Sequence, residues 1–110
     1  MKEIEKAKEI AAIVEGKNDA LALREIGFRN VIVLHREGIS LYSVIDNIQE
    51  KECAILTDVD GKGRMYHKLL KRELPLRGIR VNDNLRKEMI KEKISHVEGL
   101  ATFMKSHNLL

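Results

Sequence analysis

Short runs of mostly apolar residues alternate with longer segments of mixed polarity along almost the whole chain. Four of these runs stand out, at residues 9–15, 30–34, 53–57 and 79–81. Apolar runs of this length are typical of strands that are buried on both faces of a parallel sheet. The pattern therefore predicts four strands, spread over the first three quarters of the chain.

Between and after these runs, apolar residues recur at the spacing of a helix face. They predict helices at about 19–26, 40–49, 63–73, 83–93 and 99–107. Residues 2–8 alternate acids and bases with little apolar content, and they are expected to form a short helix or an ordered lead-in. Asn18 or Asp19 is placed to cap the helix at 19–26, and Gly27 is placed to end it. Strands separated by helices predict an α/β fold with right-handed crossovers. We expect a three-layer sandwich, with a four-stranded, largely parallel sheet and helices on both faces.

Length and composition favour one globular domain spanning residues 1–110. The chain has 44% hydrophobic and 34% charged residues, and no apolar run approaches the roughly 18 residues of a membrane span. The first residues carry acids and lack the apolar core of a signal peptide. A single cysteine, Cys53, excludes an internal disulfide. We therefore expect a cytoplasmic protein without a membrane partner.

Two of the predicted strands end at carboxylates. The first run ends at Glu15, and the third is followed by Asp58 and Asp60, one residue apart. Because ligands bind outside the carboxyl ends of parallel strands, these acids are expected along one edge of the sheet. Residues two apart in an extended segment point the same way, roughly 6–7 Å apart, so Asp58 and Asp60 are placed to share one hard cation. The alternative is a turn rich in Asp and Gly, which ends strands in many proteins.

Charge changes sign directly after these aspartates. Residues 1–61 carry a net charge of −4, whereas residues 62–80 carry +6, with Glu73 as their one acid. A basic segment beside a cation site suits a phosphate backbone. The residues expected to contact phosphate or nucleic acid are Lys17, Lys62, Arg64 and Lys68. The alternatives are a solvated helix face, or basic residues that only offset the acids.

The two acidic stretches together resemble the Toprim domain. This metal-binding module occurs in primases, type IA and type II topoisomerases, OLD-family nucleases and ribosomal-RNA maturation nucleases. The family has a strand ending in Glu-Gly, usually with an Asp three residues later, and a second strand ending in Asp-x-Asp. Primase forms add a Gly and a basic residue at the start of a helix. The matching residues here are Glu15-Gly16 with Asp19, Asp58-Val59-Asp60, and Gly63-Arg64. The resemblance covers roughly residues 9–82, and residues 83–110 would add C-terminal helices.

The resemblance implies Mg²⁺ as the cofactor, with Mn²⁺ as a substitute. In Toprim enzymes the two aspartates of the motif bind the metal, and the glutamate acts as general acid or base or joins the metal shell. These roles would belong to Asp58, Asp60 and Glu15. Asp19 is either a helix cap or a further partner of the metal site.

A domain of this kind without a second domain is expected to act as a nuclease or phosphotransferase on RNA or DNA. Glu15-Gly16-Lys17, together with residues 94–98, is also similar to the ribosomal-RNA maturation branch, which favours RNA processing. One alternative is a non-catalytic module that binds nucleic acid or docks on a complex, with a protein partner or a second copy. Another is a phosphatase of the haloacid-dehalogenase type with Asp58 as nucleophile, but in that family the residue after the Gly is usually Thr or Val, and here it is Lys62.

Overall fold

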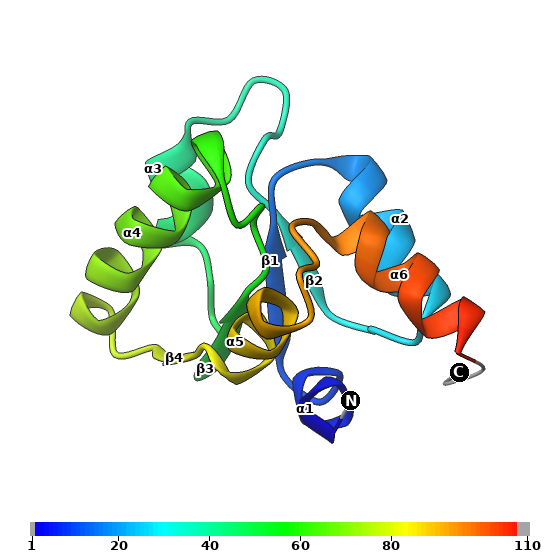
Figure 1. The fold of residues 1–110 in the computed structure, drawn as a ribbon. Helices are drawn as coiled ribbons and strands as arrows, with labels where there is room; N and C mark the ends of the chain where they lie inside the picture. The colour runs from blue at the N-terminus through cyan, green and yellow to red at the C-terminus, as the bar shows by residue number, and fades with distance from the viewer. Residues whose placement is uncertain (1, 108–110) are drawn as a thin grey trace.

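The computed structural model describes residues 2–107, which form a single layered α/β structure (Figure 1). Its elements, in chain order, are α1 (Lys2–Ala7), β1 (Ala11–Val14), α2 (Lys17–Glu25), β2 (Val31–Val33), α3 (Leu41–Asp46), β3 (Glu52–Ile55), α4 (Gly61–Leu76), β4 (Arg80–Asn82), α5 (Asn84–Lys91) and α6 (Val97–Ser106). The four strands form one all-parallel sheet in the order β2-β1-β3-β4. This confirms the predicted fold class.

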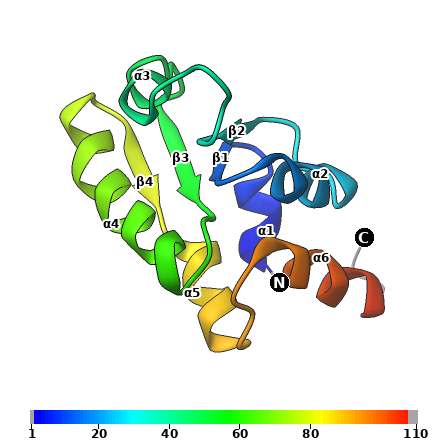
Figure 2. The same ribbon diagram turned by 90° about the horizontal axis from the view of Figure 1, so that it is seen from above.

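Helices cover both faces of the sheet. α3 and α4 lie on one face, and α1, α2, α5 and α6 lie on the other (Figures 1 and 2). Side chains of successive strand residues alternate between the two cores: Ala12 and Val14 of β1 face α2, whereas Ala11 and Ile13 face α4. This alternation explains the continuous apolar runs, because every side chain of a central strand is buried.

All ten predicted elements are present, but their boundaries differ from the predicted ones. Three of the four strands are shorter than predicted. β3 ends at Ile55, so residues 57–60 lie in an irregular, bent segment rather than in a strand. α4 begins at Gly61 rather than Gly63 and continues past Pro75 to Leu76. The chain turns away only at Gly78, whose φ of +75° lies in the left-handed region that favours glycine.

The strand order places a switch point between β1 and β3. From β1 the chain crosses through α2 to β2 on one side, and later through α4 to β4 on the other side. In open parallel sheets, ligands bind at the carboxyl ends of the strands where this reversal occurs. Glu15 follows β1 and Asp58 follows β3, so the predicted acids lie at that point. Among the described residues, no helix is long and apolar enough to span a membrane.

Candidate functional site

A hydrogen bond joins the two acidic stretches. The Glu15 carboxylate, through Oε1, accepts the backbone N–H of Asp58 at 2.8 Å. The two residues are 43 positions apart in sequence, and the parallel pairing of β1 with β3 brings them together. The expectation that these acids lie at one edge of the sheet is therefore confirmed.

Asp58 lies in an environment that disfavours its charge. Burial raises the pKa of Asp58, and the nearby carboxylates of Glu15 and Asp19, with a smaller contribution from Asp60, raise it further. His96 acts in the opposite direction. Four acids thus gather here (Glu15, Asp19, Asp58 and Asp60), and this group is called the acidic edge below.

Asp60 holds a different position from the one expected. The prediction that Asp58 and Asp60 point the same way assumed extended chain, but both residues lie in the bend between β3 and α4. Asp60 is the exposed residue that immediately precedes the first turn of α4. A carboxylate there is stabilised by the free N–H groups of the helix N-terminus. The turn rich in Asp and Gly, considered above as an alternative, describes this segment better than a strand does.

Asp19 contributes to a helix cap. Its Oδ2 accepts the backbone N–H of Gly16 at 3.1 Å, and α2 begins at Lys17 with Gly16 as its N-cap. The predicted capping role of Asp19 is therefore confirmed, although the cap residue itself is Gly16 rather than Asn18 or Asp19. The same carboxylate still lies close enough to raise the pKa of Asp58.

A buried arginine supports the bend that carries Asp58. Arg86 of α5 is only 4% exposed. Its guanidinium donates to the backbone carbonyl of Thr57 at 2.5 Å and to that of Asp58 at 2.8 Å. Arg86 was not among the predicted site residues, because a single arginine in a helix with a polar face carries no signal of burial. Its charge also lies near those of Asp58, Glu15 and Asp83.

The first turn of α4 packs directly on the same bend. Gly63 is buried, and a Cβ at this position would overlap the backbone of Asp58. The Thr57 hydroxyl donates to the carbonyl of Gly63 at 2.7 Å. Gly63 is therefore required for close approach, which gives its place in the sequence motif a physical reason.

The loop before α6 also contacts this bend, which sequence analysis did not foresee. The backbone N–H of Val59 donates to the carbonyl of Ser95 at 2.8 Å. Glu98, at the start of α6, lines an open depression of about 690 Å³ together with Glu15, Asp19 and Glu37. His35 lines the same depression, and its Nε2 lies 2.6 Å from the Tyr66 hydroxyl.

The predicted basic residues lie on the two helices that begin next to the acidic edge. Lys17 begins α2, and the other three lie along α4; all are exposed. Among the described residues, none of Lys17, Lys62, Arg64 and Lys68 forms an ion pair. Their ammonium and guanidinium groups are therefore available to an anionic ligand.

The chemistry of the donor set fits Mg²⁺. Within residues 2–107, no three Asp, Glu, His or Cys side chains are arranged as a ready-made metal shell. Mg²⁺ needs only one or two carboxylates, however, because it keeps several waters and takes other ligands from phosphate. A cation would also offset the burial and the neighbouring carboxylates that raise the pKa of Asp58.

Comparison with known proteins gives consistent matches over most of the chain. It is 32% identical over 104 residues to a UPF0292 protein of Methanocaldococcus jannaschii, covering 89% of this chain and 80% of that protein. It is 36% identical over 103 residues to a UPF0292 protein of Pyrococcus abyssi, covering 88% and 77%. A solved structure of a protein from Aquifex aeolicus matches with a TM-score of 0.75 and 34% identity, covering 88% of this chain and 91% of that one. No protein-family model matches.

Proposed function

This chain belongs to the UPF0292 family, and we propose that it is a Toprim-type protein that binds Mg²⁺ at its acidic edge and acts on nucleic-acid phosphodiesters. The observation that carries the proposal is the hydrogen bond between Glu15 and the backbone of Asp58. It unites two motifs distant in sequence at the switch point of a parallel sheet, where such folds bind ligands.

Three acids of the acidic edge take part in the proposed chemistry. Asp58 and Asp60 would hold Mg²⁺, joined by Glu15 where the shell expands. The bound ion would stabilise negative charge on a phosphate oxygen. Glu15 is held in place by the Asp58 N–H, and it would exchange a proton with the attacking or leaving oxygen. Arg86 would keep the bend that carries Asp58 in position through its two carbonyl contacts.

The basic residues favour a polyanion over a small metabolite. Lys62, Arg64 and Lys68 are exposed along α4, which begins directly after Asp60. A phosphate backbone that enters the acidic edge would therefore continue along a positively charged helix. The proposed substrate is RNA or DNA, and the experiment below distinguishes them. If the substrate is RNA, we propose RNA processing in the cytoplasm as the role.

The test compares wild-type protein with Asp58→Asn and Asp60→Asn. Each protein is incubated with structured RNA, single-stranded DNA and duplex DNA, in Mg²⁺, in Mn²⁺ and in chelator, and both binding and cleavage are scored. Glu9→Gln is the matched control, because Glu9 is an exposed acid at the opposite, amino-terminal end of β1. Metal-dependent cleavage that is lost in the two aspartate variants and kept in the control supports the proposal.

A second function is favoured by one observation. The exposed basic residues of α4, among them Lys62, Arg64 and Lys68, would suit a module that binds nucleic acid without cutting it. Nucleic-acid binding that is unchanged by chelator and by Asp58→Asn, with no cleavage of any substrate, would overturn the enzyme and establish this binding module. A phosphorylated Asp58 would instead point to phosphatase chemistry.

A further inference from the structure

The two outer strands of the sheet, β4 and β2, differ in how they are protected against pairing with a further strand. At one edge, β4 has Arg80 paired with Glu52 at 3.1 Å, and Asn82 donates to the same glutamate at 3.1 Å. At the other edge, β2 consists of Val31, Ile32 and Val33, all partly exposed. Charged residues at an edge hinder strand pairing, whereas an apolar edge without them invites it.

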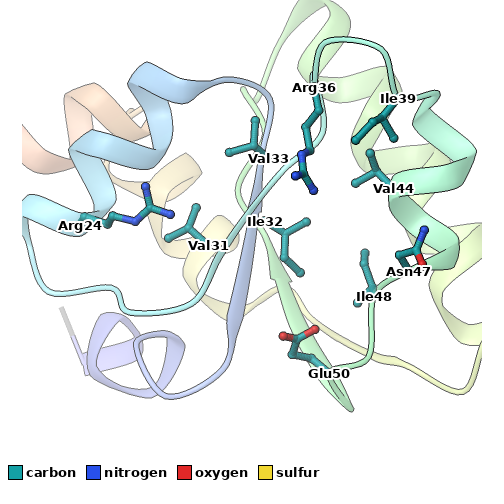
Figure 3. A pocket seen from close by; sticks show the side chains of 10 residues that line it. All are labelled: Arg24, Val31, Ile32, Val33, Arg36, Ile39, Val44, Asn47, Ile48 and Glu50. Carbon is teal, nitrogen blue, oxygen red and sulfur yellow. The ribbon is translucent and has the colours of Figure 1, made fainter.

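An open groove of about 500 Å³ follows the length of β2 (Figure 3). Apolar side chains form its centre: Ile32 lies beside Ile48 and Val44, and Ile39, which is 41% exposed, lies near its upper end. Figure 3 shows Arg36 reaching back along the carboxyl end of β2, whereas Glu50 lies at the amino end. The groove thus has an apolar middle, with Arg36 at its carboxyl end and Glu50 at its amino end, where Arg24 also lies beside Val31.

The backbone of β2 can accept a further strand. Asn30 and Leu34 direct their backbone groups to β1, since the Asn30 carbonyl accepts from Ala12 and the Leu34 N–H donates to Val14, each at 2.9 Å. Because ladder groups alternate along a strand, the N–H and C=O groups of Val31 and Val33 point away from β1. No strand among residues 2–107 lies on that outer side.

We propose that β2 pairs in antiparallel fashion with β2 of a second copy of this chain, forming a two-fold dimer with a continuous eight-stranded sheet. With Ile32 on the two-fold axis, Val31 lies opposite the second copy's Val33. These two residues then exchange both backbone hydrogen bonds, as does the symmetry-related pair. The two copies of Ile32 form the pair whose side chains approach most closely across the axis.

The charges at the ends of the groove select a second copy as the occupant. An antiparallel two-fold arrangement brings the amino end of one β2 to the carboxyl end of the other. Glu50 of each copy therefore meets Arg36 of the other, and both ends of the interface are paired. A parallel arrangement would place like charges together at each end, which opposes it. The dimer does not depend on the proposed function, because the acidic edge lies outside the groove.

The test is the mass of the full chain in solution, measured by light scattering and sedimentation over a wide concentration range. Wild type is expected at twice the chain mass. Val31→Pro removes an outward N–H and leaves the bonds between β1 and β2 intact, so it is expected to give a monomer with unchanged circular dichroism. Leu76→Lys is the matched control, since Leu76 is 76% exposed outside the groove, and it is expected to remain dimeric.

Charge reversal tests the orientation. Glu50→Arg alone and Arg36→Glu alone each place like charges at both ends, and both are expected to lose the dimer. An equal mixture of the two variants restores opposite charges at both ends and is expected to recover it. A wild type that stays monomeric at all concentrations overturns the proposal. So does a dimer that persists in Val31→Pro, or one in which the mixed variants fail to associate.

Discussion

Asp58 and Asp83 are both partly buried aspartates near Arg86, yet their surroundings are opposite. Burial raises the pKa of Asp58, and its acidic neighbours raise it further. Burial by itself would also raise the pKa of Asp83, but hydrogen bonds and charge from His67 and Lys71 outweigh this and hold it below its usual range. The Asp83 oxygens lie 3.0 Å from His67 and 3.2 Å from Lys71.

By this comparison, Asp83 is an acid that stabilises the fold, whereas Asp58 is not. Asp83 links α4 to the start of α5 through two partners, as structural ion pairs commonly do. Asp58 has like-charged neighbours, which cost stability in the protein without a bound cation. Acids kept in such surroundings are typical of functional sites. The comparison therefore supports the acidic edge as the site, rather than the Asp83 cluster.

The largest loss of stability is expected from Arg86→Met, which removes the guanidinium charge that lies near both aspartates. The carbonyls of Thr57 and Asp58 would lose their buried donor, at a cost of about 3 kcal/mol in the free energy of unfolding. Urea denaturation measures this. Lys87→Met, at the exposed neighbouring position of the same helix, is the control and is expected to change stability by less than about 0.5 kcal/mol. Equal losses in the two variants would contradict a supporting role for Arg86.

A smaller effect is expected from Asp83→Asn, with a loss of about 1 kcal/mol at neutral pH. Because the folded-state pKa of Asp83 is lowered, its stabilisation is present above the unfolded pKa and is lost as pH falls through the folded pKa. The variant and wild type are therefore expected to differ most near neutral pH and to converge in acid. Thermal melts over a pH series measure this, and a difference that is constant with pH would argue against the ion pair.

The smallest change in the free energy of unfolding is expected from Asp58→Asn, and this change is a gain in stability rather than a loss. A raised folded-state pKa means that ionised Asp58 destabilises the fold above that pKa, and that the penalty disappears below the unfolded pKa. Without metal at neutral pH, the variant is therefore expected to gain less than about 1 kcal/mol after solvent screening. Adding Mg²⁺ should stabilise wild type and leave the variant unchanged in the same melts. If the Asp58→Asn variant is less stable than wild type at neutral pH, then ionised Asp58 stabilises the fold as Asp83 does, which would contradict the comparison.

Much of the fold follows from local patterns in the sequence. The four apolar runs mark strands because each strand of a layered sheet is covered on both faces, as Ala12 and Ile13 of β1 illustrate. Helix ends were harder to place, since α4 starts two residues before the predicted position. Capping and bends depend on contacts with other segments, such as the packing of Gly63 on Asp58.

The candidate site could be predicted in part. Strand polarity places Glu15 and Asp58 at one edge, and both acids follow apolar runs that are visible in the sequence. The contribution of Arg86 was not predictable, because the carbonyl that it binds belongs to Thr57, 29 residues earlier. The same holds for Ser95, whose carbonyl binds the N–H of Val59.

The amino-acid sequence was enough to predict the α/β class, the parallel sheet, the acids at the strand ends and the basic helix that follows them. These features depend on the order of apolar and polar residues, and that order is local. The folded chain was needed to show that Asp58 lies near other acids and Asp83 near His67 and Lys71. It also shows that the outer strand β4 carries the charged Arg80, whereas no strand among residues 2–107 covers the outer side of β2. The pKa of an acid and the exposure of an outer strand both depend on which distant segments meet in the fold, and the order of the strands determines which segments meet.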